Sequence, residues 1–179
     1  VGTADGILKT TAVVGGLRLP GQGALHSLAF SPDGRTLASI HDEWILLWDH
    51  VSGALLRTIA PAFSIGFELA WHPEGHMLAA ANDDVTLIDV ESGAVLHRLV
   101  SHRSFVRSLA FRPDGELLAS AGDDQSVKLW DPEGGALVRT LTGHTGDIDG
   151  LAWSSDGRIL ASASPDQSVR LWDGDDDFT

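Results

Sequence analysis

A period of 40–42 residues runs through this sequence and constrains its fold more than any other feature. The phrase "ASAGDDQSVKLWD", from Ala119, returns 42 residues later as "ASASPDQSVRLWD", from Ala161. Turn phrases of the Pro-Asp-Gly kind end at Gly34, Gly75, Gly115 and Gly157. The pair Trp-Asp, or Ile-Asp in one case, ends at Asp49, Asp89, Asp131 and Asp173. Two independent markers with one period indicate a repeat architecture of four similar units.

Each unit contains four short strand-like runs. In the third unit these are "FVRSLAF", "LLASA", "SVKLWD" and "ALVRTLT". The connections carry Pro, Asp and Gly, which preset or permit the dihedral angles of tight turns. Four short strands joined in this way predict a four-stranded antiparallel sheet for each period. No stretch keeps a helical period for three turns, so the fold class is predicted to be all-β.

The order of these markers resembles the tryptophan–aspartate (WD) repeat family of β-propellers, whose blades run about 40–45 residues. The resemblance extends over residues 21–173. It implies a β-propeller built from four-stranded antiparallel blades and a role in protein–protein interaction. It divides the chain into an N-terminal closing strand region at 1–20, WD unit 1 at 21–61, a degenerate unit 2 at 62–101, unit 3 at 102–143, and unit 4 with an acidic tail at 144–179.

The resemblance also implies a structural hydrogen-bond network in each blade, made of a His, a Ser or Thr, an Asp and a Trp. It assigns these tetrads to His102, Ser120, Asp124 and Trp130 in unit 3, and to His144, Ser162, Asp166 and Trp172 in unit 4. The donor and acceptor types suit such a chain, because a buried Trp N–H needs an acceptor and Ser and His relay hydrogen bonds.

A hydrolase triad is the alternative interpretation of these Ser, His and Asp residues. A nucleophilic Ser is expected on an exposed strained elbow beside oxyanion donors. Here each Ser lies in mid-strand between two alanines, and the constellation occurs twice. We therefore expect a structural network and no enzymatic activity.

The first two units depart from the pattern. Unit 1 keeps a partial tetrad of Ser39, Asp42 and Trp48, with Gly21 in the His position. Unit 2 has Ala80 and Ile88 where Ser and Trp are expected. We expect unit 2 to depend on apolar packing and to be the locally weakest blade.

Neither a metal site nor a cofactor is expected. Cysteine is absent, which excludes disulfides and thiolate ligands. His72 and His76 are four residues apart, but across a turn, and are interpreted as surface residues. The C-terminal "DGDDDFT" lacks the Gly and the closing Glu of a calcium loop, so it is interpreted as a solvated acidic tail. No phosphate-binding glycine loop occurs.

The resemblance places partner binding on the rim of the ring. The candidate rim residues are Gln22, His41, Phe63, Arg103, Phe105, Asp123, Asp147 and Pro165. Exposed Phe and Arg are enriched at interface hot spots. The alternative is that Phe63 and Phe105 lie under neighbouring loops as part of the core.

The charge balance bears on the kind of partner. A formal net charge of −13 with only 12 basic residues argues against nucleic acid and anionic membranes, and favours a basic or neutral protein. No run of 18 apolar residues suggests a membrane span, and the first residues lack the pattern of a signal peptide. We expect a cytoplasmic protein, and the strong bias to Arg over Lys indicates a bacterial source.

Four blades are few, because rings of this family usually have about seven or eight. The sequence ends after a third strand, and "GLRLP" at 16–20 matches the outer strands of the units. We expect a homodimer that forms an eight-bladed ring, with each N-terminal strand clasping the last blade of the other chain. The rival is a fragment of a longer propeller.

Two other functions stay open. One is a regulatory or sensor domain of a larger bacterial signalling kinase or NTPase, and the other is a small-ligand binder using the central channel.

Overall fold

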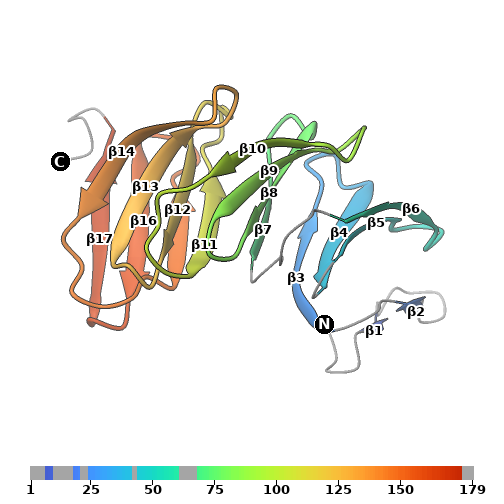
Figure 1. Cartoon of the computed structure of the whole chain (residues 1–179), viewed down its shortest axis with the longest axis horizontal. Coiled ribbons are helices and arrows are strands. Elements are labelled where there is room, and N and C mark those ends of the chain that lie inside the picture. Colours follow the sequence, from blue (N-terminus) through green and yellow to red (C-terminus); the bar gives the residue numbers. More distant parts are fainter. Residues whose placement is uncertain (1–6, 10–17, 21–23, 42–43, 61–67, 175–179) are drawn as a thin grey trace.

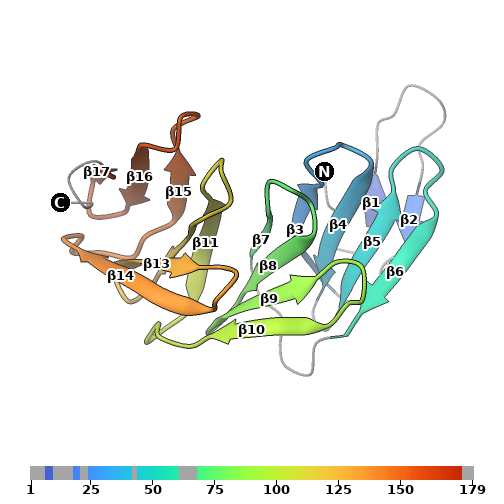
Figure 2. The same ribbon diagram turned by 90° about the horizontal axis from the view of Figure 1, so that it is seen from above.

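The computed structural model describes residues 7–9, 18–20, 24–41, 44–60 and 68–174. Four antiparallel sheets stand side by side in a curved row, with one further pair of short strands beyond the first sheet (Figures 1 and 2). We call the four sheets blades 1 to 4 in chain order. Every regular element among the described residues is a strand, which confirms the predicted all-β fold class.

The strands of each blade follow one another in chain order across the sheet. Blade 1 contains β3 (Leu25–Phe30), β4 (Thr36–His41), β5 (Ile45–Asp49) and β6 (Leu55–Ile59). Blade 2 contains β7 (Glu68–Trp71), β8 (Met77–Ala81), β9 (Val85–Asp89) and β10 (Val95–Leu99). Blade 3 contains β11 (Val106–Phe111), β12 (Leu118–Gly122), β13 (Ser126–Asp131) and β14 (Ala136–Thr142). Blade 4 contains β15 (Gly150–Trp153), β16 (Ile159–Ser164) and β17 (Ser168–Asp173).

The repeated turns have the chemistry that the sequence predicts. The glycine that ends each Pro-Asp-Gly phrase has a positive φ, for example 81° at Gly115, and its amide donates a hydrogen bond to the carbonyl three residues earlier. The Asp of the Trp-Asp pair shapes the next turn. Asp49 accepts hydrogen bonds from the backbone amide and the hydroxyl of Ser52 through Oδ1. These local bonds fix the hairpins and therefore the register of each blade.

Three of the four hydrophobic core clusters among the described residues lie between blades, and the fourth consists of Leu37, Leu46 and Trp48 of blade 1. Side chains of β4 and β5 pack on those of β7, β8 and β9, and the same joint recurs between blades 2 and 3 and between blades 3 and 4. An aromatic side chain at the end of the first strand of blades 2, 3 and 4 contributes to the joint with the preceding blade. Trp71 Nε1 donates to the Ala29 carbonyl of blade 1 at 3.0 Å, and Trp153 Nε1 donates to the Ala110 carbonyl of blade 3 at 3.0 Å.

The row has two different ends. Blade 4 has three strands in the described part of the chain, so β17 forms its edge. The strands β1 (Ile7–Lys9) and β2 (Arg18–Pro20) pair with each other. They lie beyond blade 1, at the end of the row opposite to β17 (Figures 1 and 2). The strand expected within 16–20 therefore exists at 18–20 but is not paired with β17 of its own chain.

Candidate functional site

In blade 3 the tetrad residues form one continuous hydrogen-bonded chain. Trp130 Nε1 donates to Ser120 Oγ at 2.8 Å, and Ser120 Oγ lies 2.7 Å from His102 Nε2. His102 Nδ1 lies 2.9 Å from Asp124 Oδ2. Asp124 ends the chain by accepting hydrogen bonds from the Arg103 amide at 3.1 Å and from the Ser126 hydroxyl at 2.8 Å. The network therefore connects the second and third strands to the loop before β11.

Blade 4 repeats the same arrangement. Trp172 Nε1 donates to Ser162 Oγ at 2.9 Å, and Ser162 Oγ lies 2.8 Å from His144 Nε2. His144 Nδ1 lies 2.7 Å from Asp166 Oδ2. Asp166 also accepts a hydrogen bond from the Thr145 amide at 3.0 Å. The agreement between the two blades, bond for bond, is what a scaffold repeated along the chain requires.

The electrostatics of the network follow from burial and hydrogen bonding. Burial lowers the pKa of His102 below its ordinary value, although the nearby Asp124 carboxylate acts in the opposite sense. Burial acts to raise the pKa of Asp124, but the Ser126 hydroxyl, His102 and the Arg103 amide outweigh it and the pKa is lowered. The folded state thus favours neutral His102 beside a carboxylate. Trp130, Ser120 and His102 then each donate to the next group along the chain.

Blade 1 contains a version of the network that sequence reasoning missed. Trp48 Nε1 donates to Ser39 Oγ at 2.9 Å, and Ser39 Oγ lies 3.2 Å from His41 Nε2. His41 is 1% exposed, so its assignment to the binding rim is wrong. It comes from the same strand as Ser39, two residues on, whereas the tetrad His comes from the preceding loop. The signal was present as Ser-x-His within one strand, because residues two apart share a face. Asp42 and Gly21 lie outside the described residues.

Blade 2 has apolar residues at the tetrad positions. Ala80 is 2% exposed and Ile88 is fully buried, and both belong to the core between blades 1 and 2. Leu78 and Leu87, on the two central strands, are also fully buried. The positions of the Ser and the Trp in blades 3 and 4 are therefore occupied by aliphatic packing in blade 2.

The structure brings several candidate rim residues together beside the tetrads. The Asp123 amide donates to the Phe105 carbonyl at 3.0 Å, so the loop before β11 lies against the turn between β12 and β13. Phe105 is 44% exposed, and Arg103 is exposed next to it. Asp123 is paired with Arg107, whose Nη2 lies 3.1 Å from Asp123 Oδ2.

The corresponding loops of blade 4 carry the other described candidates. Asp147 is half-buried and Pro165 is exposed. They flank the contact between the Thr145 amide and Asp166. Gln22 and Phe63 lie outside the described residues.

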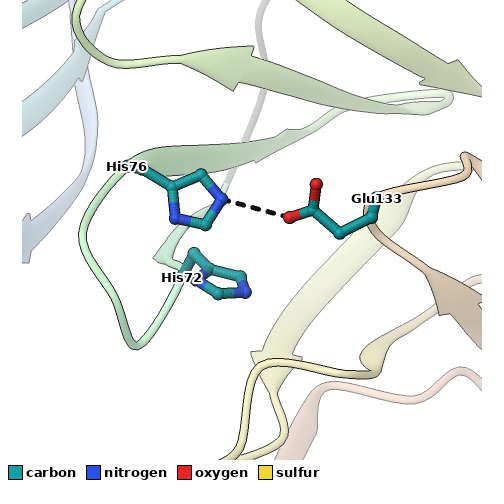
Figure 3. A group of neighbouring side chains, drawn as sticks. All are labelled: His72, His76 and Glu133. Carbon is teal, nitrogen blue, oxygen red and sulfur yellow. Dashed lines mark hydrogen bonds and ion pairs between the residues drawn. The ribbon is translucent and has the colours of Figure 1, made fainter.

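A second cluster, at the opposite turns of blades 2 and 3, contains His72, His76 and Glu133 (Figure 3). His76 Nε2 lies 3.1 Å from Glu133 Oε1, and one ligand-type atom of each residue lies within 4.8 Å of the others. His72 is only 4% exposed, so its interpretation as a surface residue is wrong. Burial, with the neighbouring His76, lowers the pKa of His72 and favours its neutral form.

Sequence reasoning could not find this cluster because Glu133 is 57 residues from His76 and belongs to the next blade. The spacing His-x₃-His is an informative signal on a helix, where residues four apart are neighbours. Here the two histidines flank the turn between β7 and β8. The hairpin brings them together, and their ring centroids are 4.3 Å apart.

The part of the chain that the structure describes contains no helix long and apolar enough to cross a membrane.

Comparison with models of known protein families gives one family. The model described as WD40 (WD domain, G-beta repeat) matches residues 16–49, 93–131 and 135–173. Two of these segments contain the tetrads of blades 3 and 4, and the region between the first and second segments contains most of the degenerate blade 2. The matches cover more than half of the chain, and the chain is accordingly a member of the WD40 repeat family.

Proposed function

We propose that this chain is a non-catalytic interaction scaffold that binds a protein partner at the rim of blades 3 and 4. WD40 repeats form β-propeller scaffolds that typically mediate protein interactions. The observation that carries the proposal is the link between the tetrads and the rim loops. The Asp124 and Asp166 carboxylates accept hydrogen bonds from the amides of Arg103 and Thr145. Each buried network thus holds the loop that presents the exposed residues.

The buried environment of the tetrads supports a structural role for them. Ser120 is fully buried, and its hydroxyl oxygen already lies within hydrogen-bond distance of Trp130 and His102. A nucleophilic Ser instead needs access to substrate and donors for an oxyanion. The rim has the opposite character, since Phe105 and Arg103 are exposed and both residue types are enriched at protein interfaces. The net charge of −13 favours a basic or neutral partner.

A capture experiment tests the binding rim. The purified chain, its Phe105→Ala/Arg103→Ala variant and a Val138→Ala control are immobilised, and captured proteins are identified by mass spectrometry. Val138 is 55% exposed on β14, away from the rim loops, which makes it a matched surface change. We expect a specific partner that the rim variant loses and the control keeps. A partner retained by the rim variant contradicts this site. Hydrolytic turnover that disappears in Ser120→Ala, with folding intact, contradicts the non-catalytic role.

We further propose that two copies of the chain complete one ring. Val169 and Leu171 on β17 are 67% and 66% exposed, whereas Val127 and Leu129 at the same positions of β13 are fully buried under blade 4. At the other end Phe30 is 59% exposed, whereas Trp71, in the same place on blade 2, is half-buried against blade 1. The β17 end thus carries one open half of a joint, whereas blade 1 is open at Phe30 but already buries Leu37, Leu46 and Trp48 in a separate cluster.

A two-fold arrangement of two copies would cover both ends with the surfaces they fit. β2 supports the same arrangement, because the family match from residue 16 places it where β10 and β14 stand in the later matches. By this alignment β2 corresponds to the outer, fourth strand of a blade. The edge of β17 is where such a strand would pair. Native mass spectrometry tests the proposal. We expect a species of twice 19.0 kDa. A well-folded monomer contradicts it, and so does a dimer that persists unchanged when residues 1–20 are removed.

A further inference from the structure

The cluster at the turns of blades 2 and 3 consists of metal-ligand side chains that neither the hydrogen-bond network nor the rim uses. We propose that His72, His76 and Glu133 bind one divalent transition-metal ion of the zinc type, which clamps blade 2 to blade 3. His72 and His76 flank the turn between β7 and β8, and Glu133 lies in the turn between β13 and β14 (Figure 3). The ion would therefore connect residues of two neighbouring blades.

The distances suit a metal after small side-chain movements. Ligands placed tetrahedrally at about 2.0–2.2 Å from zinc are separated from one another by about 3.4 Å. His76 Nε2 and Glu133 Oε1 are 3.1 Å apart, and all three donor atoms lie within 4.8 Å of one another. The side chains of His76 and Glu133 are 40% and 71% exposed. They have room to close on an ion beside the buried His72.

The ring of His72 is held at both nitrogens. Nδ1 accepts a hydrogen bond from the Glu74 amide at 3.2 Å, which leaves Nε2 to donate to the Gly115 carbonyl at 3.2 Å. Both distances are at the long end of the range for such bonds. A metal at Nδ1 would replace the contact with the Glu74 amide and leave the Nε2–H donating to the Gly115 carbonyl. A backbone partner at the other ring nitrogen is the usual way in which a protein orients a metal-bound imidazole.

The turns of blade 3 are shaped around histidines of blade 2. A Cβ added to Gly115 would lie 2.4 Å from His72 Nε2, and a Cβ added to Gly135 would lie 2.5 Å from His97 Nδ1. The Phe111 ring packs edge-on against His72, with the ring centroids 5.2 Å apart. His97 Nε2 lies 2.9 Å from the Glu133 carbonyl oxygen and fixes the backbone that carries this ligand. His72 is therefore held rigidly, and the turn that carries Glu133 is anchored by His97.

The donor set selects the class of metal. Two imidazoles and one carboxylate, with a position left for water, are typical of zinc and its neighbours among the divalent transition metals. Calcium and magnesium prefer sites built entirely of oxygen ligands. Cysteine is absent from the chain, so a thiolate centre is excluded. A free metal position would be held by water, which suits an ion near the surface.

The position of the cluster gives the ion a structural role. Blade 2 has Ala80 and Ile88 where blades 3 and 4 have the Ser and Trp of their networks. An ion shared with Glu133 would supply a polar connection at this blade and link it to the intact blade 3. Because a ligand that binds only the folded state stabilises it, zinc should raise the melting temperature of the chain.

Titration of the purified full-length chain with ZnCl₂ tests the proposal. Calorimetry measures affinity and stoichiometry, and thermal melts measure the stabilisation. His76→Ala and Glu133→Gln are the test variants because both residues are exposed, so their loss should leave folding intact. His50→Ala is the control, since His50 is an exposed histidine of blade 1. We expect one zinc ion per chain, a raised melting temperature, and an affinity at least about tenfold weaker in both test variants, because even outer-shell changes cost 10–100-fold.

The control and the other cations complete the test. His50→Ala should bind zinc with unchanged affinity, and CaCl₂ or MgCl₂ at the same concentration should not raise the melting temperature. No stoichiometric zinc binding overturns the proposal. Zinc binding that is equally tight in His76→Ala and Glu133→Gln overturns it as well, since the ion then binds elsewhere. Stabilisation by calcium equal to that by zinc would place the ion on oxygen ligands and exclude this site.

Discussion

At the scale of single residues, the three buried serines Ser39, Ser120 and Ser162 each accept a hydrogen bond from a tryptophan. The distances from Trp Nε1 to Ser Oγ are 2.8–2.9 Å. Replacing any of the three by Ala strands a buried indole N–H, so we expect a loss of about 1–3 kcal/mol in the free energy of unfolding. Urea denaturation measures it. Ser155→Ala, an exposed turn position, is the control and should change stability by less than about 0.5 kcal/mol.

The comparison between these serines is informative because of His41. Without a histidine partner, Ser39→Ala would cost less than Ser120→Ala. The structure gives Ser39 a partner in His41 Nε2 at 3.2 Å, so we expect losses in the same range. A Ser39→Ala variant as stable as the wild type would show that the blade 1 network contributes nothing.

The same residues predict a dependence of stability on pH. Burial places the pKa of His102 below its ordinary value of 6.5, so the unfolded chain binds a proton at higher pH than the folded chain. The contribution of His102 to stability is therefore complete above about pH 6.5 and is lost as the pH falls through the lower, folded pKa. Urea denaturation at pH 7.5 and at lower pH, with EDTA present, measures this loss. His102→Gln should lose less stability over that interval, and an unchanged loss would contradict the assignment.

At the scale of elements, blades 2 and 3 form a matched pair, since each lies between two other blades. Blade 3 has a complete tetrad, and blade 2 has aliphatic packing at the positions of the Ser and the Trp. Local opening of blade 2 breaks no such network, so we expect amides of β8 and β9 to exchange hydrogen faster than those of β12 and β13. Hydrogen exchange with mass spectrometry measures the two regions in one sample. Equal or slower exchange in β8 and β9 would show that apolar packing replaces the network fully.

The elements themselves could be predicted from the sequence because their determinants are local. The first hairpin of a blade is set by a turn phrase and the last by the Asp that ends the third strand, and these markers recur every 40–42 residues. His41 was wrongly predicted to lie on the rim, because in blade 1 a histidine within the strand contacts the buried serine. In blades 3 and 4 a histidine from the preceding loop makes this contact. The cluster of His72 and Glu133 was not foreseen because packing of one blade on the next creates it. Contacts of this kind depend on the angle between blades, which no local pattern specifies.

At the scale of the whole molecule, the three joints between blades show what the two end surfaces are built to contact. Val127 and Val169 occupy the same position in β13 and β17, yet Val127 is fully buried and Val169 is 67% exposed. If a second copy covers β17, a charge at Val169 would be buried in an apolar joint without a partner, which is costly. We therefore expect Val169→Glu to shift the chain from dimer to monomer. Val138→Glu is the matched control, because Val138 is 55% exposed on β14, the outer strand of blade 3, and belongs to none of the core clusters between blades.

Sedimentation or native mass spectrometry over a range of concentrations measures the shift, and circular dichroism confirms that both variants keep their strands. The two substitutions add the same charge to the same residue type at similar exposure, so general effects of charge cancel between them. Equal association of Val169→Glu and Val138→Glu would mean that β17 is not an interface between copies. Its apolar edge would then be left for a further blade supplied by another chain or by a longer form of this one. Dissociation confined to Val169→Glu would show that the joint found three times inside the chain is formed again between two chains.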